Sequence, residues 1–227
     1  MEKTVVPECN LLENRKVYIG YHMIAVIDYS MGNLKSVSKA LIRVGGDVIV
    51  TPNPGVAKEA EGIVLPGVGA FAQGIQNLER RGFLPFLSEW GKTSQPLLGI
   101  CLGMHLLFTE GEEGGLHRGL DLIHGRVKRF PDKVKVPHMG WNQVILSRGS
   151  GEDLFLRNIA DGSSFYFAHS YYGEPDDPRV VVGITEYGVQ FASVVRRGHI
   201  LGVQFHPEKS DRNGLSLLAN FVRMTNG

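Results

Sequence analysis

Short apolar runs alternate with segments of helical periodicity from residue 23 to residue 101, and no other feature of the sequence constrains the fold as strongly. The first run, MIAVID, is followed by turn residues and by a segment in which Val37, Leu41 and Ile42 predict one apolar helix face. Further strands are expected at 48–51, 63–65 and 97–100, with helices near 56–60 and 70–80. Strands that alternate with helices form a parallel sheet covered on both faces. The first half is therefore predicted as a layered α/β unit.

The second half of the chain is rich in β-branched and aromatic residues and predicts strands joined by tight turns. The turns at 187–188 and 197–198 lie between adjacent apolar runs, as in antiparallel hairpins. Polar segments at 110–119 and 173–178 are predicted as surface loops, and an amphipathic helix is expected from about residue 215. The expected fold class is α/β, with a largely parallel central sheet and antiparallel hairpins in the C-terminal half.

Composition places the chain among globular proteins and excludes several classes of function. Of 227 residues, 43% are hydrophobic and 21% charged, and 24 basic against 23 acidic residues give a net charge of +1. Proteins that act mainly on nucleic acid need a clustered basic excess, which this balance does not supply. No apolar run approaches the roughly 18 residues that cross a bilayer, and charges interrupt residues 1–22, where a secretory signal would be apolar. Two cysteines cannot build a disulfide framework, so a reducing cytoplasm is expected.

The segment Gly99-Ile100-Cys101-Leu102-Gly103 follows an apolar strand and precedes a helical segment. This is the pattern of a nucleophile elbow, a strained turn that exposes a reactive side chain, here Cys101 in place of a serine. Small residues are required two positions on either side, because the strand and helix backbones crowd together. The start of the following helix favours a thiolate, and the amide of Leu102 points at a developing oxyanion. The alternative is a buried structural cysteine in a glycine-rich turn.

His206 is the best candidate for the base that a cysteine nucleophile needs. It stands at the end of an apolar strand, where Pro207 ends the β-ladder and turns the chain. Glu208 follows closely enough to hold the imidazole in one tautomer. The three side chains would act as nucleophile, general base and then acid, and orienting group. Without Cys101, His206 would be interpreted as an ordinary histidine at a strand end.

The segment LPGVGA at 65–70 is a second strand-to-helix turn. Its glycine spacing also fits a dinucleotide-binding fingerprint, but it does not follow the first strand and no clear acidic partner stands at a later strand end. The favoured interpretation is a flexible backbone that presents an amide to an oxyanion beside Cys101.

Six segments together resemble the glutaminase subunits of imidazole glycerol phosphate synthase, which are class I, or triad, glutamine amidotransferases. They are MIAVIDYSMGNLKSV, LPGVGAF, GICLGM, VPHMGWNQV, FYFAHSYY and GVQFHPEKS. The elbow and the HPE segment are shared across the wider class, whereas PGVG, PHMGWN and the MGNL segment single out this subunit. The resemblance runs from Met23 to the C-terminus, so residues 1–22 are expected to be an extension outside the fold and 23–227 one amidotransferase domain. It implies a three-layer, flavodoxin-like fold.

The resemblance implies that the triad hydrolyses L-glutamine to glutamate and ammonia through a glutamyl thioester. The oxyanion would be held by the amide of Leu102 and by the turn formed by Gly67, Val68 and Gly69, the latter after a peptide flip in the active complex. Ammonia would pass to a (β/α)8-barrel cyclase subunit, the partner in a heterodimer. That subunit makes imidazole glycerol phosphate and an aminoimidazole carboxamide ribotide in histidine biosynthesis. Neither a metal nor an organic cofactor is implied.

Two further sets of residues receive roles from the resemblance. Near the α-amino and α-carboxylate groups of the substrate it places His169, Ser170 and Tyr171, which otherwise predict only a half-buried strand. To the docking face and coupling signal it assigns Asn33, Trp141 and Lys209. Without the resemblance these three would be a helix cap, a core aromatic residue and a solvated lysine.

Two positions depart from the family pattern. His105 stands four residues after the nucleophile, where the family has a glutamine that helps to bind the substrate. An imidazole cannot copy the geometry of an amide, so substrate affinity and the pH profile are the properties most affected. Ser30 replaces the usual glycine of the first loop. Two other hypotheses are a different class I amidotransferase or cysteine hydrolase of this fold that acts alone, and a catalytically silent binding subunit, which His105 motivates.

Overall fold

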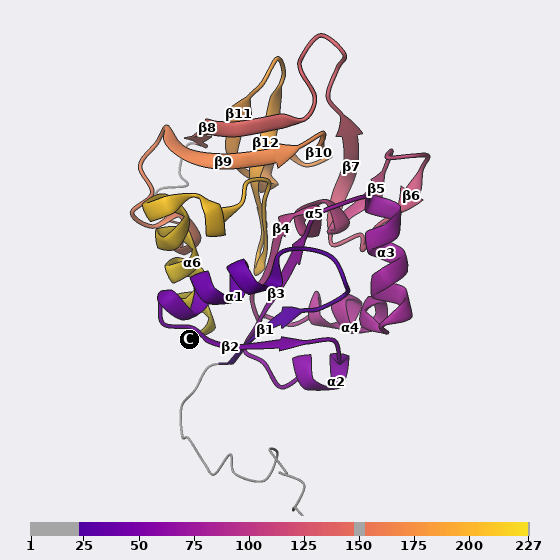
Figure 1. The fold of residues 1–227 in the computed structure, drawn as a ribbon, viewed down its shortest axis with the longest axis vertical. Helices are drawn as coiled ribbons and strands as arrows, with labels where there is room; N and C mark the ends of the chain where they lie inside the picture. The colour runs from indigo at the N-terminus through magenta and orange to yellow at the C-terminus, as the bar shows by residue number, and fades with distance from the viewer. Residues whose placement is uncertain (1–22, 148–152, 227) are drawn as a thin grey trace, which may run out of the picture.

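A computed structural model describes residues 23–147 and 153–226, so the predicted extension at 1–22 lies outside the described residues. Five parallel strands form the centre of the sheet, in the order β2-β1-β3-β4-β13. They are β1 (Met23–Ile27), β2 (Asp47–Thr51), β3 (Gly62–Gly67), β4 (Leu97–Cys101) and β13 (Ile200–Val203). Figure 1 shows these strands in the lower half of the molecule, with helices on either side.

Side chains that alternate along the strands fill two separate hydrophobic cores, as expected for a sheet covered on both faces. Ile24 and Val26 belong to one core, whereas Ala25 and Ile27 belong to the other. The first core is closed by α1 (Leu34–Arg43) and α6 (Asp211–Thr225), and the second by α3 (Phe71–Arg80), α4 (Phe83–Trp90) and α5 (Leu102–Leu106). The short α2 (Pro54–Ala57) follows β2. This arrangement confirms the predicted three-layer α/β fold.

The sheet continues beyond β13 as an antiparallel and mixed region. Its path runs through β12 (Gln190–Arg197), β10 (Tyr171–Pro175), β7 (Ile123–Arg129), β5 (Phe108–Gly111) and β6 (His117–Arg118). A branch adds β11 (Val181–Glu186), β8 (His138–Leu146) and β9 (Ser163–His169). Strand β12 pairs antiparallel with both β11 and β13, which confirms the two predicted hairpins. Figure 1 shows β8 and β9 crossing above the parallel strands, so that β9 brings its last residues toward the end of β4.

Several elements differ from the sequence predictions. The predicted loops at 110–119 and 173–178 contain parts of β5 and β10 and all of β6, because β5 and β10 both pair with β7, and β6 pairs with β5. Helix α4 was not predicted; it begins after Gly82, whose φ of 73° turns the chain directly after α3. Ile42 does not share the buried face of α1, since 56% of it is exposed. Ser30 has φ 65°, the conformation for which glycine is favoured, and its amide donates to Asp28.

Candidate active site

Cys101 lies on a tight turn between β4 and α5, and its backbone is strained. Its φ of 53° is uncommon for a residue with a side chain and is typical of a nucleophile elbow. A Cβ atom added to Gly99 would lie 2.7 Å from the carbonyl oxygen of Gly103, and one added to Gly103 would overlap the carbonyl oxygen of Leu65. The predicted need for glycine on both sides of the nucleophile is therefore confirmed as a steric requirement.

The elbow faces His206, which lies at the end of the strand segment that begins with β13. The imidazole Nδ1 lies 2.9 Å from Glu208 Oε1, which leaves Nε2 for its hydrogen bond with Cys101. His206 is buried, and the side chain of Glu208 is only 2% exposed. The backbone around the imidazole is fixed because Ser210 Oγ donates to the carbonyl of His206 and accepts from the amide of Tyr166. The three predicted triad residues thus lie together.

Burial lowers the pKa of His206, but the hydrogen bonds and negative charges of Cys101 and Glu208 outweigh burial and raise it to about 10. The imidazole is therefore charged near neutral pH and is ready to give a proton to a leaving group. The helix that follows the cysteine, α5, is 5 residues long.

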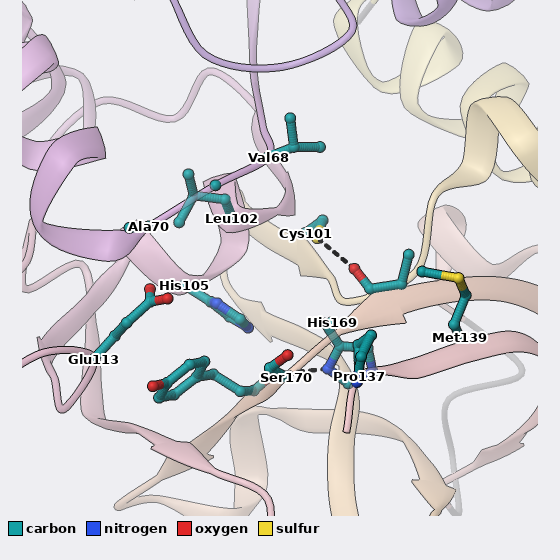
Figure 2. A pocket seen from close by; sticks show the side chains of 13 residues that line it. Val68, Ala70, Cys101, Leu102, His105, Glu113, Pro137, Met139, His169 and Ser170 are labelled. Carbon is teal, nitrogen blue, oxygen red and sulfur yellow. Dashed lines mark hydrogen bonds between the residues drawn. The ribbon is translucent and has the colours of Figure 1, made fainter. Parts of the chain in front are cut away.

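Cys101 opens into a pocket of about 380 Å³ between the elbow and the end of β9. Figure 2 shows Cys101 between Val68 above it and His169 below it. The cysteine Sγ lies 4.0 Å from the carbonyl oxygen of Ala168. The lining combines titratable, apolar and backbone groups: Val68, Gly69, Ala70, Cys101, Leu102, His105, Glu113, Pro137, Met139, Ala168, His169, Ser170 and Tyr171. The volume suits a small ligand.

The predicted oxyanion turn lies directly beside the nucleophile. Gly67 is the last residue of β3, and its Cα is the parallel partner of that of Cys101. Val68 and Gly69 continue from it into the pocket lining, and Gly69 has φ 112°. Leu102 lines the same pocket. The structure therefore brings all four residues assigned to the oxyanion close to Cys101.

Opposite the elbow, a chain of hydrogen bonds fixes the tautomers of two buried histidines. His169 Nδ1 lies 2.7 Å from the carbonyl oxygen of Tyr171, which can only accept, so Nδ1 carries the proton and Nε2 is bare. His138 Nδ1 lies 3.0 Å from that Nε2 and must donate to it. Asn142 Nδ2 in turn donates to His138 Nε2 at 3.2 Å and to the carbonyl of Glu186 at 3.0 Å. The chain joins β8 to the strand end beside Cys101.

Both histidines of this chain are neutral near pH 7. Burial lowers the pKa of His138 to about 4. The pKa of His169 is lowered mainly by burial, against a hydrogen bond to the Tyr171 carbonyl, and further by the nearby His105, His138 and His206. A charged His206 therefore lies close to neutral imidazoles, which supply hydrogen bonds without a competing positive charge.

His105 lies on α5, lines the pocket and forms a hydrogen bond with the buried Gln204. Its Nε2 lies 2.7 Å from Gln204 Oε1, so this nitrogen donates and Nδ1 is bare. Burial lowers the pKa of His105 to about 4, although the bond to Gln204 opposes the shift. The replacement of the family glutamine thus places a neutral imidazole in the lining.

The sequence predictions missed Glu113, whose side chain also reaches the pocket. Its Oε2 accepts a hydrogen bond of 2.7 Å from the backbone amide of Phe71, at the start of α3. Nothing local in the sequence distinguishes Glu113 from the other acids of this segment, because its position depends on a contact between residues 42 apart. His138 and Gln204 were also missed, although both lie in segments that carried the resemblance.

The three residues assigned to the partner surface lie outside the pocket. Asn33 caps α1, and its side chain accepts from the amide of Ser36 at 3.2 Å. Trp141 is 53% exposed, so the core-aromatic alternative is wrong. It meets the ring of Tyr166 edge-on, with centroids 6.2 Å apart, and Lys209 Nζ lies 5.8 Å from the centroid of the same ring. Trp141 and Lys209 thus belong to one exposed cluster.

Two absences hold for residues 23–147 and 153–226. No group of three or more histidine, cysteine or acidic side chains there is arranged to hold a metal ion. No helix in those ranges is both long and apolar enough to span a membrane.

Comparison with known proteins decides the family. The family described as glutamine amidotransferase class-I matches residues 25–224. The imidazole glycerol phosphate synthase subunit HisH of Moorella thermoacetica is 54% identical over 198 residues, which cover 87% of this chain and 93% of that protein. The HisH subunit of Geobacter sulfurreducens is 47% identical over 208 residues, with 88% and 98% covered. The chain belongs to the HisH family of class I glutamine amidotransferases.

Solved structures support the fold of this HisH-family chain. A glutamine amidotransferase crystal structure aligns with a TM-score of 0.70 at 17% identity, covering 90% of this chain and 99% of that one. A glutamine amidotransferase from Thermotoga maritima aligns with a TM-score of 0.61 at 18% identity, covering 91% and 100%. The predicted family and fold class are confirmed, and the chain is an enzyme of the glutamine amidotransferase class.

Proposed function

We propose that Cys101 hydrolyses L-glutamine to glutamate and ammonia, and that the ammonia is used by the cyclase partner of an imidazole glycerol phosphate synthase in histidine biosynthesis. The observation that carries the proposal is the hydrogen-bonded series of Cys101, His206 and Glu208 beside a pocket of about 380 Å³. A nucleophile, a proton carrier and an orienting carboxylate are the groups that amide hydrolysis by a cysteine requires.

The charged His206 is the group that carries protons in both halves of the reaction. The Cys101 thiolate attacks the carboxamide carbon of glutamine, forming the C–S bond and an oxyanion. When the C–N bond breaks, His206 gives its proton to the leaving nitrogen, so that ammonia departs and a glutamyl thioester remains. Water then attacks the thioester while the neutral His206 takes a proton from it. Breakage of the C–S bond releases glutamate and restores the thiolate beside the imidazolium.

The pocket lining offers partners for the other groups of the substrate. The amides of Leu102 and of the Gly67-Val68 turn would stabilise the oxyanion, because both flank Cys101. The carboxylate of Glu113 suits the α-ammonium group of glutamine. We place the α-carboxylate near Ser170 and Tyr171, which also line the pocket.

An exposed rim beside the pocket suits the cyclase subunit, which we expect to be a (β/α)8 barrel. Val68 and Met139 line the pocket but are 46% and 65% exposed, and the cluster of Trp141 and Lys209 extends the exposed surface. Large exposed apolar side chains gathered around a site are typical of a protein interface. Docking there would cover the mouth through which ammonia leaves. A free buried thiol suits the reducing cytoplasm, where we place the complex.

The experiment is glutamate release by the chain alone, with its cyclase, and with the cyclase and its nucleotide ligand. We expect strong turnover only with the partner present and none from Cys101→Ala in any mixture. Equal turnover by the isolated chain would contradict the coupled function, and activity of Cys101→Ala would contradict the assigned nucleophile.

The partner surface is tested by binding to the cyclase. Trp141→Ala should weaken the complex by about 2 kcal/mol, the size of an interface hot spot. Val50→Ala is the control, because Val50 is also exposed but lies on β2, the edge strand at the other end of the molecule from β8 in Figure 1. Equal affinity for both variants would remove Trp141 from the interface.

A further inference from the structure

Tyr29 carries a buried hydroxyl group that the proposed chemistry does not yet use. The residue follows β1 and has no exposed surface, and its Oη has no hydrogen-bond partner among the described residues. Buried polar groups in proteins are nearly always paired, so an unpaired hydroxyl beside a reactive centre calls for a functional explanation.

The hydroxyl lies against the first residue of the oxyanion turn. A Cβ atom on Gly67 would overlap Tyr29 Oη, and would also lie 2.9 Å from Leu102 Cβ and 3.2 Å from the amide nitrogen of Gly103. From the same loop as Tyr29, a Cβ on Gly32 would lie 3.2 Å from the Cα of Gly67. Because Gly67 has no side chain, nothing separates the hydroxyl from the backbone of the turn.

Tyr29 can only act as a neutral donor or acceptor in this place. Burial raises the pKa of its phenol, and the negative charge of the nearby Cys101 raises it further. The O–H bond therefore persists near neutral pH, so the hydroxyl is always able to donate to an acceptor.

The carbonyl oxygen of Gly67 is the acceptor that the geometry supplies. The C=O and N–H of one trans peptide point in opposite directions. If the amide of Val68 is aimed at the oxyanion beside Cys101, the carbonyl of Gly67 must point away from β4, toward the side of β3 on which β1 lies. Tyr29 belongs to the loop that follows β1, and its hydroxyl reaches Gly67. Glycine at position 67 permits this rotation without steric cost.

We propose that Tyr29 is a positioning residue, whose hydroxyl donates to the Gly67 carbonyl and thereby holds the Val68 amide in the oxyanion hole during turnover. The proposal rests on the proposed glutaminase function. In the structure described above the hydroxyl is unpaired, so its hydrogen bond is gained only when the turn adopts the catalytic orientation. Tyr29 thus favours that orientation over the resting one.

The test is Tyr29→Phe in the complex with the cyclase and its nucleotide ligand. We expect kcat for glutamine to fall at least about tenfold, the order expected when an oxyanion donor is weakened, with KM changed less than about twofold. The melting temperature of the isolated chain should stay the same or rise, since no hydrogen bond is lost in the resting state. A kcat within twofold of the unmodified complex would overturn the proposal, as would a lower melting temperature.

Tyr187→Phe is the matched control. Its hydroxyl donates to the carbonyl of Lys135 at 2.8 Å, so its loss should lower the melting temperature and leave kcat unchanged. The rate at which iodoacetamide alkylates Cys101 separates two roles, because this reaction has no oxyanion. If the alkylation rate is unchanged in Tyr29→Phe, the result supports a role of Tyr29 in positioning the oxyanion turn. If the alkylation rate falls together with kcat, Tyr29 acts on the Cys101 sulfur instead, and the proposal is overturned. Loss of turnover in the unmodified complex would instead refute the proposed function.

Discussion

The elbow and the strand pair β8–β9 meet at Cys101, but different forces hold them in place. On the elbow side, β3, β4 and α5 touch through their backbones, and Gly99 and Gly103 leave no room for a side chain. On the other side, the end of β9 is held by side chains, through the chain of hydrogen bonds from Asn142 to His138 and His169. One half of the site is fixed sterically and the other by polar pairing.

This difference explains what each half can do. Close backbone contacts leave the elbow little freedom, so the nucleophile keeps one geometry relative to the sheet. Hydrogen bonds hold β9 only while each donor meets its acceptor. The hydrogen-bonded chain of Asn142, His138 and His169 begins on β8, the strand that carries the exposed Trp141. The polar half therefore connects the strand that carries Trp141 to the strand end beside Cys101.

A glycine-to-alanine substitution should destabilise the protein much more at the elbow than in β8. In Gly103→Ala the added methyl group overlaps the Leu65 carbonyl, and we expect a loss of more than about 4 kcal/mol of unfolding free energy. Gly140→Ala in β8 meets no atom within 4 Å but has φ 134°, so backbone strain alone should cost about 1–3 kcal/mol. Denaturant titration measures both, and similar losses would contradict the contrast.

Removal of the charge on Glu208 should harm catalysis without harming the fold. In Glu208→Gln the imidazolium of His206 loses its carboxylate partner, and we expect kcat to fall about 10²- to 10⁴-fold. Glu174→Gln is the control, since Glu174 forms only a partly exposed pair with Lys128. Steady-state glutamine hydrolysis by the complex gives the values, and a loss shared by both variants would point to a general effect of charge.

Breaking the polar chain should cost stability in proportion to one buried hydrogen-bond partner. His138→Phe keeps an aromatic ring against Tyr187 and Phe167 but removes the donor to His169, so unfolding should become easier by about 1–3 kcal/mol. His124→Phe, at an exposed pair with Asp121, should change stability by less than about 0.5 kcal/mol. If His138→Phe lost no more unfolding free energy than His124→Phe, the hydrogen bonds of His138 would not hold β9 in place.

A loss of stability of similar size, which depends on pH, is expected from His105. Its folded pKa of about 4 lies below the usual 6.5, so the unfolded chain binds more protons between these values and stability falls as the pH drops. From pH 7 to 4.5 this histidine should account for about 2 kcal/mol of the loss. His105→Gln should lack that part of the decline in urea titrations at the two pH values. An identical decline would show that His105 titrates normally.

The two halves also differ in how well the sequence predicts them. The steric crowding at the elbow requires glycines at fixed spacing around Cys101 within one short segment, so a local pattern predicts the nucleophile and its neighbours. The parallel sheet is likewise predicted by a local pattern, the alternation of strands and helices. The histidine chain joins residues 31 apart across two strands, and no local pattern marks His138 as the partner of His169. Glu113 and the polar strand β5 were missed for the same reason, since contacts distant in sequence place them.

The central claim is that Cys101 is the nucleophile toward glutamine in the pocket between these two halves. It is tested most directly by an L-glutamine analogue that carries a reactive diazoketone in place of the carboxamide, incubated with the cyclase complex and followed by peptide mass spectrometry. We expect one adduct, on the peptide that contains Cys101, and protection by excess glutamine. Modification at another residue, or an adduct on Cys101 that glutamine does not prevent, would contradict the account.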